Sequence, residues 1–175
     1  MKKSNAFVLF TLLSFSTFQS CQPDDELTAD TLIEEEVTPT SSFEDIPQLL
    51  QPYFAKFESE AALRGFDIDL SIQNISAEIS EISDDGVAGT CTYGSNHPGH
   101  IVIDQSFWNQ ASENLKEMVI FHELGHCSLH RGHREGAYSN GACVSIMRSG
   151  LGDCIDNYRP VTRSIYLDEL FTESF

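Results

Sequence analysis

The stretch His122–His133, which reads HELGHCSLHRGH, constrains the fold more than any other part of the chain. On an α-helix, residues four apart lie about 40° from each other on one face, so His122 and His126 can direct their rings at one metal ion. Glu123 is one step round the helix and can reach a water on that ion without binding the metal. This part of the chain is therefore predicted to be a helix with one face turned to an open site.

Two imidazoles and a carboxylate in this HExxH order are typical of catalytic zinc sites, in which Glu123 would act as general base. Such sites take three protein ligands. His130 continues the series, but eight residues of helix rise about 12 Å, whereas bonds from zinc to nitrogen are about 2 Å. One ion therefore cannot take His122, His126 and His130 from an unbroken helix.

His133 is the predicted third ligand. It follows Gly132, and glycine readily takes the left-handed conformation that ends helices. We expect the helix to run to about His130 and the chain to turn back at Gly132. The alternatives for the third ligand are His130 itself or a later carboxylate such as Glu135 or Asp153.

These histidines, followed by Ser145-Ile146-Met147, resemble the metzincin clan of zinc peptidases, whose pattern is HExxHxxGxxH with a methionine-containing turn beneath the metal. The resemblance covers roughly residues 87–171 and implies that Met147 is that Met-turn. It departs from the clan in spacing, because the third histidine follows His126 by seven residues rather than six. It also departs at Ser149, where the clan often has a tyrosine that steadies the oxyanion. The candidates to replace this phenol are Tyr138, Tyr158 and Arg148.

Hydrophobic periodicity and the resemblance together predict an α+β fold, a small zincin-like or metzincin-like domain. We expect a mixed, twisted sheet of about four strands with an N-terminal helix, an active-site helix and a C-terminal helix. The helices are predicted from Ser42 or Pro47 to Gly65, from Ser106 or Ser112 to about His130, and from about Pro160 to Phe171. The strands are predicted at residues 66–72, 75–79, 87–93 and 100–104.

The N-terminus resembles a bacterial lipoprotein signal. A basic start precedes the apolar run Ala6–Phe18, which is shorter than the roughly 20 residues that span a bilayer, and Ser20-Cys21 follows as a small-residue junction. We therefore assign residues 1–21 to a signal peptide with lipidation at Cys21. The alternative is an ordinary cleaved signal that contains a cysteine.

Residues 22–42 are predicted to be an acidic, disordered tether, and residues 43–175 the metallopeptidase domain. The segment 22–45 has many Asp and Glu residues and no Lys or Arg, so self-repulsion keeps most of it extended. The formal net charge of −17 also argues against nucleic-acid partners, because phosphate contacts need clustered basic residues.

Four cysteines follow Cys21, and an even number in an exported chain predicts two disulfides. Three pairings are possible, and the sequence does not select among them. Our choice is Cys91 with Cys127 and Cys143 with Cys154. Cys127 lies about 100° round the helix from His126, so we expect it to face the sheet rather than the metal.

Together these features predict a zinc endopeptidase that binds a protein or peptide substrate, extended along the edge strand at residues 87–93. We expect a monomer anchored by lipid at Cys21 in the bacterial outer membrane, facing the periplasm or the cell surface. One alternative is a non-catalytic cell-surface binding lipoprotein with a structural zinc. Another is a lipoprotein without any metal.

Overall fold

The computed structural model describes residue 43, residues 45–150 and residues 152–172, and for residues 152–154 the backbone alone. The predicted signal peptide, the lipidation site Cys21 and the predicted tether lie outside these residues, as does the side chain of Cys154. Predictions that concern them stay predictions.

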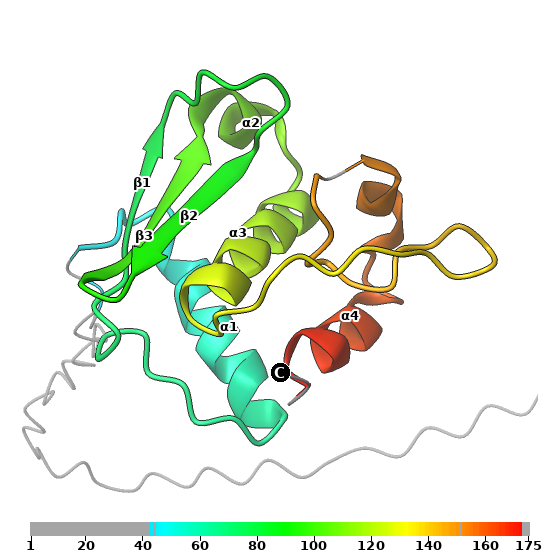
Figure 1. The fold of residues 1–175 in the computed structure, drawn as a ribbon, viewed down its shortest axis with the longest axis horizontal. Helices are drawn as coiled ribbons and strands as arrows, with labels where there is room; N and C mark the ends of the chain where they lie inside the picture. Colours follow the sequence, from blue (N-terminus) through cyan, green and yellow to red (C-terminus); the bar gives the residue numbers. More distant parts are fainter. Residues whose placement is uncertain (1–42, 44, 151, 173–175) are drawn as a thin grey trace, which may run out of the picture. The chain divides into compact units, whose positions relative to one another are not determined.

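The described chain is a mixed α+β fold with four α-helices and a three-stranded sheet (Figure 1). In chain order, the elements are α1 (Gln51–Leu63), β1 (Ser76–Ser80), β2 (Gly89–Gly94), β3 (His97–Asp104), α2 (Gln105–Gln110), α3 (Glu113–Cys127), a short 3₁₀ helix η1 (Gly152–Asn157) and α4 (Arg163–Leu170). The expected α+β class is confirmed. Within the described residues, no helix is both long and apolar enough to span a membrane.

The sheet has the strand order β1-β3-β2, so β2 is an edge strand. β1 pairs with β3 in parallel and β2 pairs with β3 antiparallel, which makes the sheet mixed as expected. Ala77, Ile101 and Ile103 are buried on one face of the sheet. This alternation of buried positions follows the two-residue period of a strand.

The expectation of about four strands is wrong at residues 66–72, which form an irregular segment and then a turn although apolar and polar residues alternate there. The carboxylate of Asp69 accepts hydrogen bonds from the backbone N–H groups of Ser71 and Ile72, at 3.0 and 3.2 Å. The backbone N–H of Leu70 donates to Glu58 of α1 at 2.7 Å. These side chains satisfy backbone groups that a strand would pair with another strand, so the segment turns against α1 instead.

The helices differ from their predicted bounds mainly at their starts. α1 begins at Gln51 and is followed by Gly65 with φ 84°, as a helix-ending glycine should be, and α4 begins at Arg163 rather than near Pro160. Of the two starts predicted for the active-site helix, Ser112 is correct, because it is the N-cap of α3, whereas Ser106 lies in the separate helix α2. Asp104 caps α2 by accepting a hydrogen bond from the backbone N–H of Phe107 at 2.7 Å, and α3 starts anew after extended Ser112.

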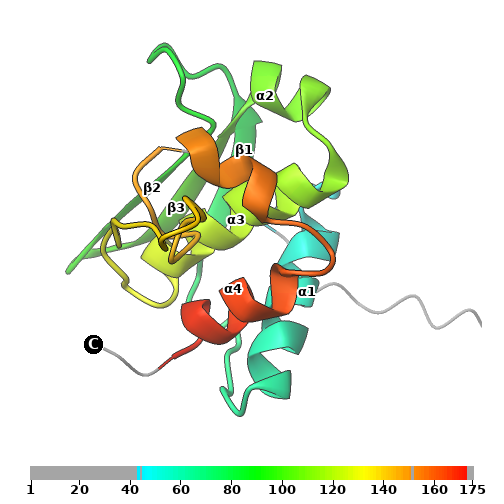
Figure 2. The same cartoon turned by 90° about the vertical axis from the view of Figure 1, so that its right-hand side faces the viewer.

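α3 lies between the sheet and helices α1 and α4 (Figures 1 and 2). It packs on β2 and β3 on one side and on α1 on the other. The ring of Phe121 meets that of Phe57 of α1 edge to face at a centroid distance of 5.1 Å, and both side chains are fully buried. Such burial on two sides holds α3 firmly, and α3 carries the HExxH residues.

Candidate metal centre

His122, Glu123 and His126 all lie on α3, as their spacing predicts. The two histidines are four residues apart, and the glutamate directly follows the first of them. His122 is 9 % exposed and Glu123 5 % exposed, which is unusual for polar side chains. Polar groups that are buried in this way need partners or a function.

The turn after α3 does not use Gly132. The helix ends at Cys127, three residues before the predicted end at about His130. His130 itself takes the left-handed conformation, with φ 53°, and Gly132 does not adopt a positive φ. The backbone N–H of Arg131 closes the turn by donating to the carbonyl of Gly125 at 2.9 Å. The left-handed residue that ends the helix is therefore His130, and not Gly132 as predicted.

A packing contact holds His130 in this conformation, which costs a non-glycine residue about 1–2 kcal/mol. Its ring lies against that of Tyr93 at the end of β2, with a centroid distance of 5.1 Å. His130 does not belong to the group of histidines that have metal-ligand spacing.

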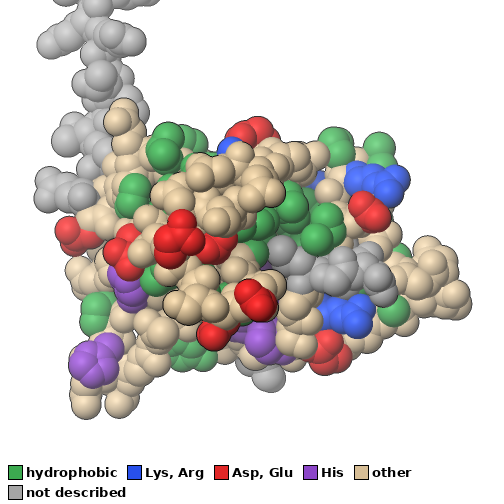
Figure 3. Space-filling model, turned by 90° about the horizontal axis from the view of Figure 1, so that it is seen from above, with side chains coloured by type: hydrophobic (Ala, Val, Ile, Leu, Met, Phe, Trp, Pro, Cys, Tyr) green, Lys and Arg blue, Asp and Glu red, His purple; other side chains and the backbone are tan. Residues whose placement is uncertain are grey.

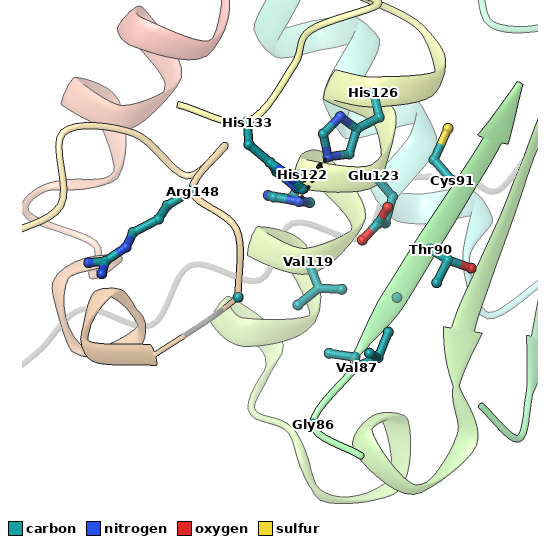
Figure 4. Close-up of a pocket in the computed structure, with 13 residues that line it drawn as sticks. Gly86, Val87, Thr90, Cys91, Val119, His122, Glu123, His126, His133 and Arg148 are labelled. Atoms are coloured by element: carbon teal, nitrogen blue, oxygen red, sulfur yellow. Dashed lines mark hydrogen bonds between the residues drawn. The ribbon is translucent and has the colours of Figure 1, made fainter. Parts of the chain in front are cut away.

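The rings of His122, His126 and His133 converge on one point (Figure 4). Nε2 of His126 lies 3.1 Å from Nε2 of His122 and 3.2 Å from Nε2 of His133. Tetrahedral bonds of about 2.0 Å place two ligand nitrogens about 3.3 Å apart. The three atoms thus have the spacing of ligands on one ion, and the three residues could hold a metal.

Backbone carbonyls orient two of these rings. Nδ1 of His122 lies 2.6 Å from the carbonyl oxygen of Ile146, and Nδ1 of His126 lies 2.6 Å from that of Arg131. Only a protonated Nδ1 can donate to a carbonyl, so Nε2 keeps its lone pair for a metal. Burial lowers the pKa of His122 to about 4, and it lowers that of His126 as well. Both imidazoles are therefore neutral near pH 7, as ligands must be.

The predicted Met-turn packs against the helix between the two histidines. Met147 is fully buried, and a Cβ on Gly125 would lie 2.4 Å from its sulfur. Because Gly125 has no side chain, Met147 can approach the helix closely. The neighbouring Ile146 supplies the carbonyl that orients His122, so this loop both packs on α3 and orients one of the candidate ligands.

Glu123 lies against β2. A Cβ on Gly89 would be 3.0 Å from both Cγ and Oε1 of Glu123, so the strand can approach the carboxylate only because residue 89 has no side chain. Burial raises the pKa of Glu123 to about 8. A carboxyl group with such a pKa can hold a proton near neutral pH.

A pocket of about 330 Å³ opens between β2 and α3 (Figure 4). One wall is the chain from Gly86 to Cys91, and the other carries Val119 and the group of His122, Glu123, His126 and His133, with Arg148 and Gly150 at the rim. The histidine group and the carboxylate therefore face the same space as the edge strand.

The disulfide between Cys91 and Cys127 forms as predicted, with a Cα–Cα distance of 5.8 Å. It joins the edge strand to the last residue of α3, so both walls of the pocket are covalently linked. A Cβ on Gly99 would be 3.0 Å from the sulfur of Cys127, and this glycine makes room for the bond. Cys143 is also disulfide-bonded, but the side chain of Cys154 lies outside the described residues, so the pairing Cys143–Cys154 stays a prediction.

Glu135, one of the two alternative carboxylate ligands, does not belong to the histidine group. Glu135 accepts a hydrogen bond from the backbone N–H of Ser149 at 2.9 Å and pairs with Arg148 at 3.3 Å. The side chain of Asp153, the remaining candidate ligand, lies outside the described residues. Within the described residues, the one group of three or more His, Cys, Asp or Glu with metal-ligand spacing is His122, His126 and His133.

None of the three candidates to replace the missing phenol stands at the histidine group. Tyr158 is buried and donates to Glu117 at 2.5 Å, and Tyr138 is 55 % exposed. Arg148 does line the pocket, but its guanidinium points away from the histidines (Figure 4).

Two exposed acidic residues, Asp84 and Asp85, directly precede Gly86 in the pocket wall. On the face of the molecule seen from above, several acidic side chains lie near the middle, with histidine side chains beside them (Figure 3).

Sequence reasoning missed Gly89 and Gly99, the two glycines that let β2 and β3 approach α3. Isolated glycines within a strand pattern are a signal of close backbone approach. Which part of the fold packs against each glycine can be seen only in the folded structure. Comparison with models of known families, with curated proteins and with solved structures found no match for this chain.

Proposed function

We propose that this protein is a zinc-dependent endopeptidase. The observation that carries the proposal is the convergence of the Nε2 atoms of His122, His126 and His133 in a pocket that also contains the Glu123 carboxylate and an edge strand. The donors fit zinc, since imidazole nitrogens at tetrahedral spacing are ligands that it prefers.

An open ligand position favours catalysis over a structural role. In the part of the chain that the structure describes, no fourth His, Cys, Asp or Glu joins the three histidines. Structural zinc sites close the fourth position with a protein ligand, whereas catalytic sites leave it open. Zinc bound there would acidify water and polarise a carbonyl group.

Glu123 is the proton carrier in this proposal. It would accept the proton of the attacking water and pass it to the leaving amine. Its burial raises its pKa to about 8, which suits the step in which it holds the proton, and the charge of a bound zinc would favour the ionised carboxylate that accepts this proton. His122 and His126, held by backbone carbonyls, would keep their Nε2 atoms fixed throughout.

The edge strand β2 supports an extended peptide as the substrate. Its inner edge pairs with β3, and its outer backbone groups border the pocket. An extended chain can add to such an edge through main-chain hydrogen bonds, which need no particular side chains. Val87 and Val119 offer an apolar surface for a side chain of that peptide.

The decisive experiment measures bound zinc and hydrolysis of a denatured protein in parallel. We expect Glu123→Gln to keep zinc and lose hydrolysis, and His133→Ala to lose both. His130→Ala is the matched control, because His130 contacts Tyr93 instead of the group, and it should keep zinc. Full hydrolysis by Glu123→Gln would contradict the proposal.

One observation favours a second candidate, a non-catalytic binding protein with zinc. Ser149 stands where the metzincin clan, which this chain resembles, often has a tyrosine. The side chains of Tyr138, Tyr158 and Arg148 do not point at the histidines and so do not replace that tyrosine. A wild-type protein that binds one zinc and tightly binds peptides, but hydrolyses none of them, would support this candidate. A melting temperature that does not change when a chelator is added would rule out both the peptidase and the zinc-containing binding protein.

We also propose that Cys21 is lipidated and anchors the monomeric domain in the bacterial outer membrane. This rests on the signal-like sequence alone. Fractionation of cells that express the wild type and Cys21→Ala tests it, because loss of the lipid should move the protein from the membrane to the soluble fraction. Equal membrane content of the two would contradict it.

A further inference from the structure

Arg131 is a buried arginine that binds the C-terminal end of α4. Its Nη1 donates to the carbonyl oxygens of Glu169 and Leu170 at 2.8 and 2.7 Å, and its Nη2 pairs with the carboxylate of Glu169 at 2.6 Å. The last carbonyls of a helix lack partners within the helix, and its C-terminus favours a cation. Arg131 satisfies both needs, although it is itself only 7 % exposed.

The backbone of the same residue contacts the histidine group. Its carbonyl oxygen accepts the hydrogen bond of His126 Nδ1 at 2.6 Å, and its N–H donates to the carbonyl of Gly125 at 2.9 Å. Arg131 stands between left-handed His130 and the residues that lead to His133. Figures 1 and 2 both place the C-terminal end of α4 beside this turn.

We propose that Arg131 is a positioning residue through which α4 sets the metal affinity of the site. The guanidinium fixes the turn against α4, and the turn fixes both the carbonyl that orients His126 and the path to His133. The inference rests on the proposed metal site, but it does not depend on peptidase activity.

The shape of the guanidinium explains why the residue is arginine. Its planar fork directs several N–H donors at once, here to two carbonyl oxygens and one carboxylate oxygen. A lysine offers a single nitrogen on a flexible stem. Arg131→Lys should therefore keep only part of the contact that fixes the turn against α4.

Arg64 provides a matched control. It also binds α4, through Asp168 at 2.9 Å, but its other partner is Glu60 of α1 at 2.6 Å. Arg64→Met therefore removes an arginine contact to the same helix without touching the turn that carries the histidines. It should lower stability and leave metal affinity unchanged.

The test measures the dissociation constant for zinc by chelator competition and the visible spectrum of Co²⁺ bound in place of zinc. For Arg131→Met we expect affinity to fall about tenfold, as when other outer-shell partners are lost, and the Co²⁺ bands to shift. Arg131→Lys should lie between Arg131→Met and the wild type. A purely structural role would lower stability in both Arg131→Met and Arg64→Met but move the spectrum in neither.

A folded Arg131→Met with wild-type affinity and spectrum would overturn the inference alone. A wild type that binds no zinc would instead overturn the proposed function, and the inference with it. If Arg131→Met does not fold, Glu169→Gln replaces it and Arg134→Met is its control, because the carboxylate of Glu169 pairs with both Arg131 and Arg134, at 2.6 and 2.7 Å. Weaker zinc binding by Glu169→Gln than by Arg134→Met supports the inference, and equal binding by the two variants overturns it.

Discussion

At the scale of single residues, the packing between helix α3 and the Met-turn depends on Gly125. We predict that Gly125→Ala destabilises the protein, because the added Cβ would lie 2.4 Å from the sulfur of Met147. Alanine favours a helix by about 1 kcal/mol over glycine, but overpacking costs about 1–3 kcal/mol and should outweigh it. Denaturant unfolding with and without zinc measures the loss.

Gly132→Ala is the control for this prediction. No atom lies within 4 Å of a Cβ built on Gly132, and its φ is not positive. The variant should be as stable as the wild type. Equal free energies of unfolding for Gly125→Ala and Gly132→Ala would show that the contact with Met147 is not tight.

A second residue-scale prediction concerns the contact between β2 and the proposed general base. Gly89→Ala should lower hydrolysis at least about tenfold while zinc stays bound, because the new Cβ would displace the Glu123 carboxylate and a misplaced base loses most of its effect. Gly94→Ala, in the same strand and with open space around it, is the control. Loss of zinc together with activity would mean that the strand supports the histidines instead.

Single residues also show how far a sequence can predict such a site. His122, Glu123 and His126 follow from helix spacing alone, because all three lie on one short helical stretch. His133 could be chosen over His130 by length arguments. The turn between them could not be located, since the glycine rule favoured Gly132, whereas the contact of His130 with Tyr93 joins residues far apart in the chain.

At the scale of elements, the disulfide Cys91–Cys127 joins the edge strand to the end of α3. The bond closes a loop with a sequence separation of 36 residues, and replacing both cysteines with alanine should lower the free energy of unfolding by about 3–4 kcal/mol. Denaturant titration of the double variant checks this. Zinc should remain bound, because neither cysteine belongs to the histidine group, and a zinc-free double variant would contradict that assignment.

The elements themselves were predictable where one local pattern acted alone. β1 follows from the alternation at residues 75–79, the HExxH helix follows from helical periodicity, and β2 follows the turn signal at residues 84–86. Residues 66–72 alternate as well, but Asp69 captures backbone N–H groups in a turn and Glu58 of α1 binds that of Leu70. A side chain from a different element decides the outcome there, and periodicity carries no information about it.

At the scale of the whole molecule, Glu117 of α3 connects three parts of the fold. Its buried carboxylate binds Lys56 of α1, Arg163 of α4 and the hydroxyl of Tyr158, and Arg163 also reaches Glu60 of α1 at 2.6 Å. Breaking a buried charge network by removing one partner is usually costly, at about 3–5 kcal/mol. This network therefore holds α1 and α4 against the helix that carries the site.

The network predicts how stability depends on pH. Burial alone would raise the pKa of Glu117, but hydrogen bonds from Arg163, Lys56 and Tyr158 outweigh it, so the pKa lies below its ordinary value of 4.5. Between the folded and unfolded pKa values the unfolded chain binds more protons, so acid favours unfolding. The stabilisation by Glu117 is complete above pH 4.5 and is lost as the pH falls through the folded pKa.

Glu117→Gln should therefore be markedly less stable than the wild type at pH 7, and the difference should shrink as the pH is lowered below 4.5. Denaturant unfolding of both proteins at several pH values without zinc measures it, since zinc binding has a pH dependence of its own. The direction of this pH dependence distinguishes a paired carboxylate from one that is buried without partners. A carboxyl group whose pKa was raised by burial would destabilise the fold more as the pH rises. A difference that grows towards low pH would contradict the assignment of Glu117 as a charged, paired carboxylate.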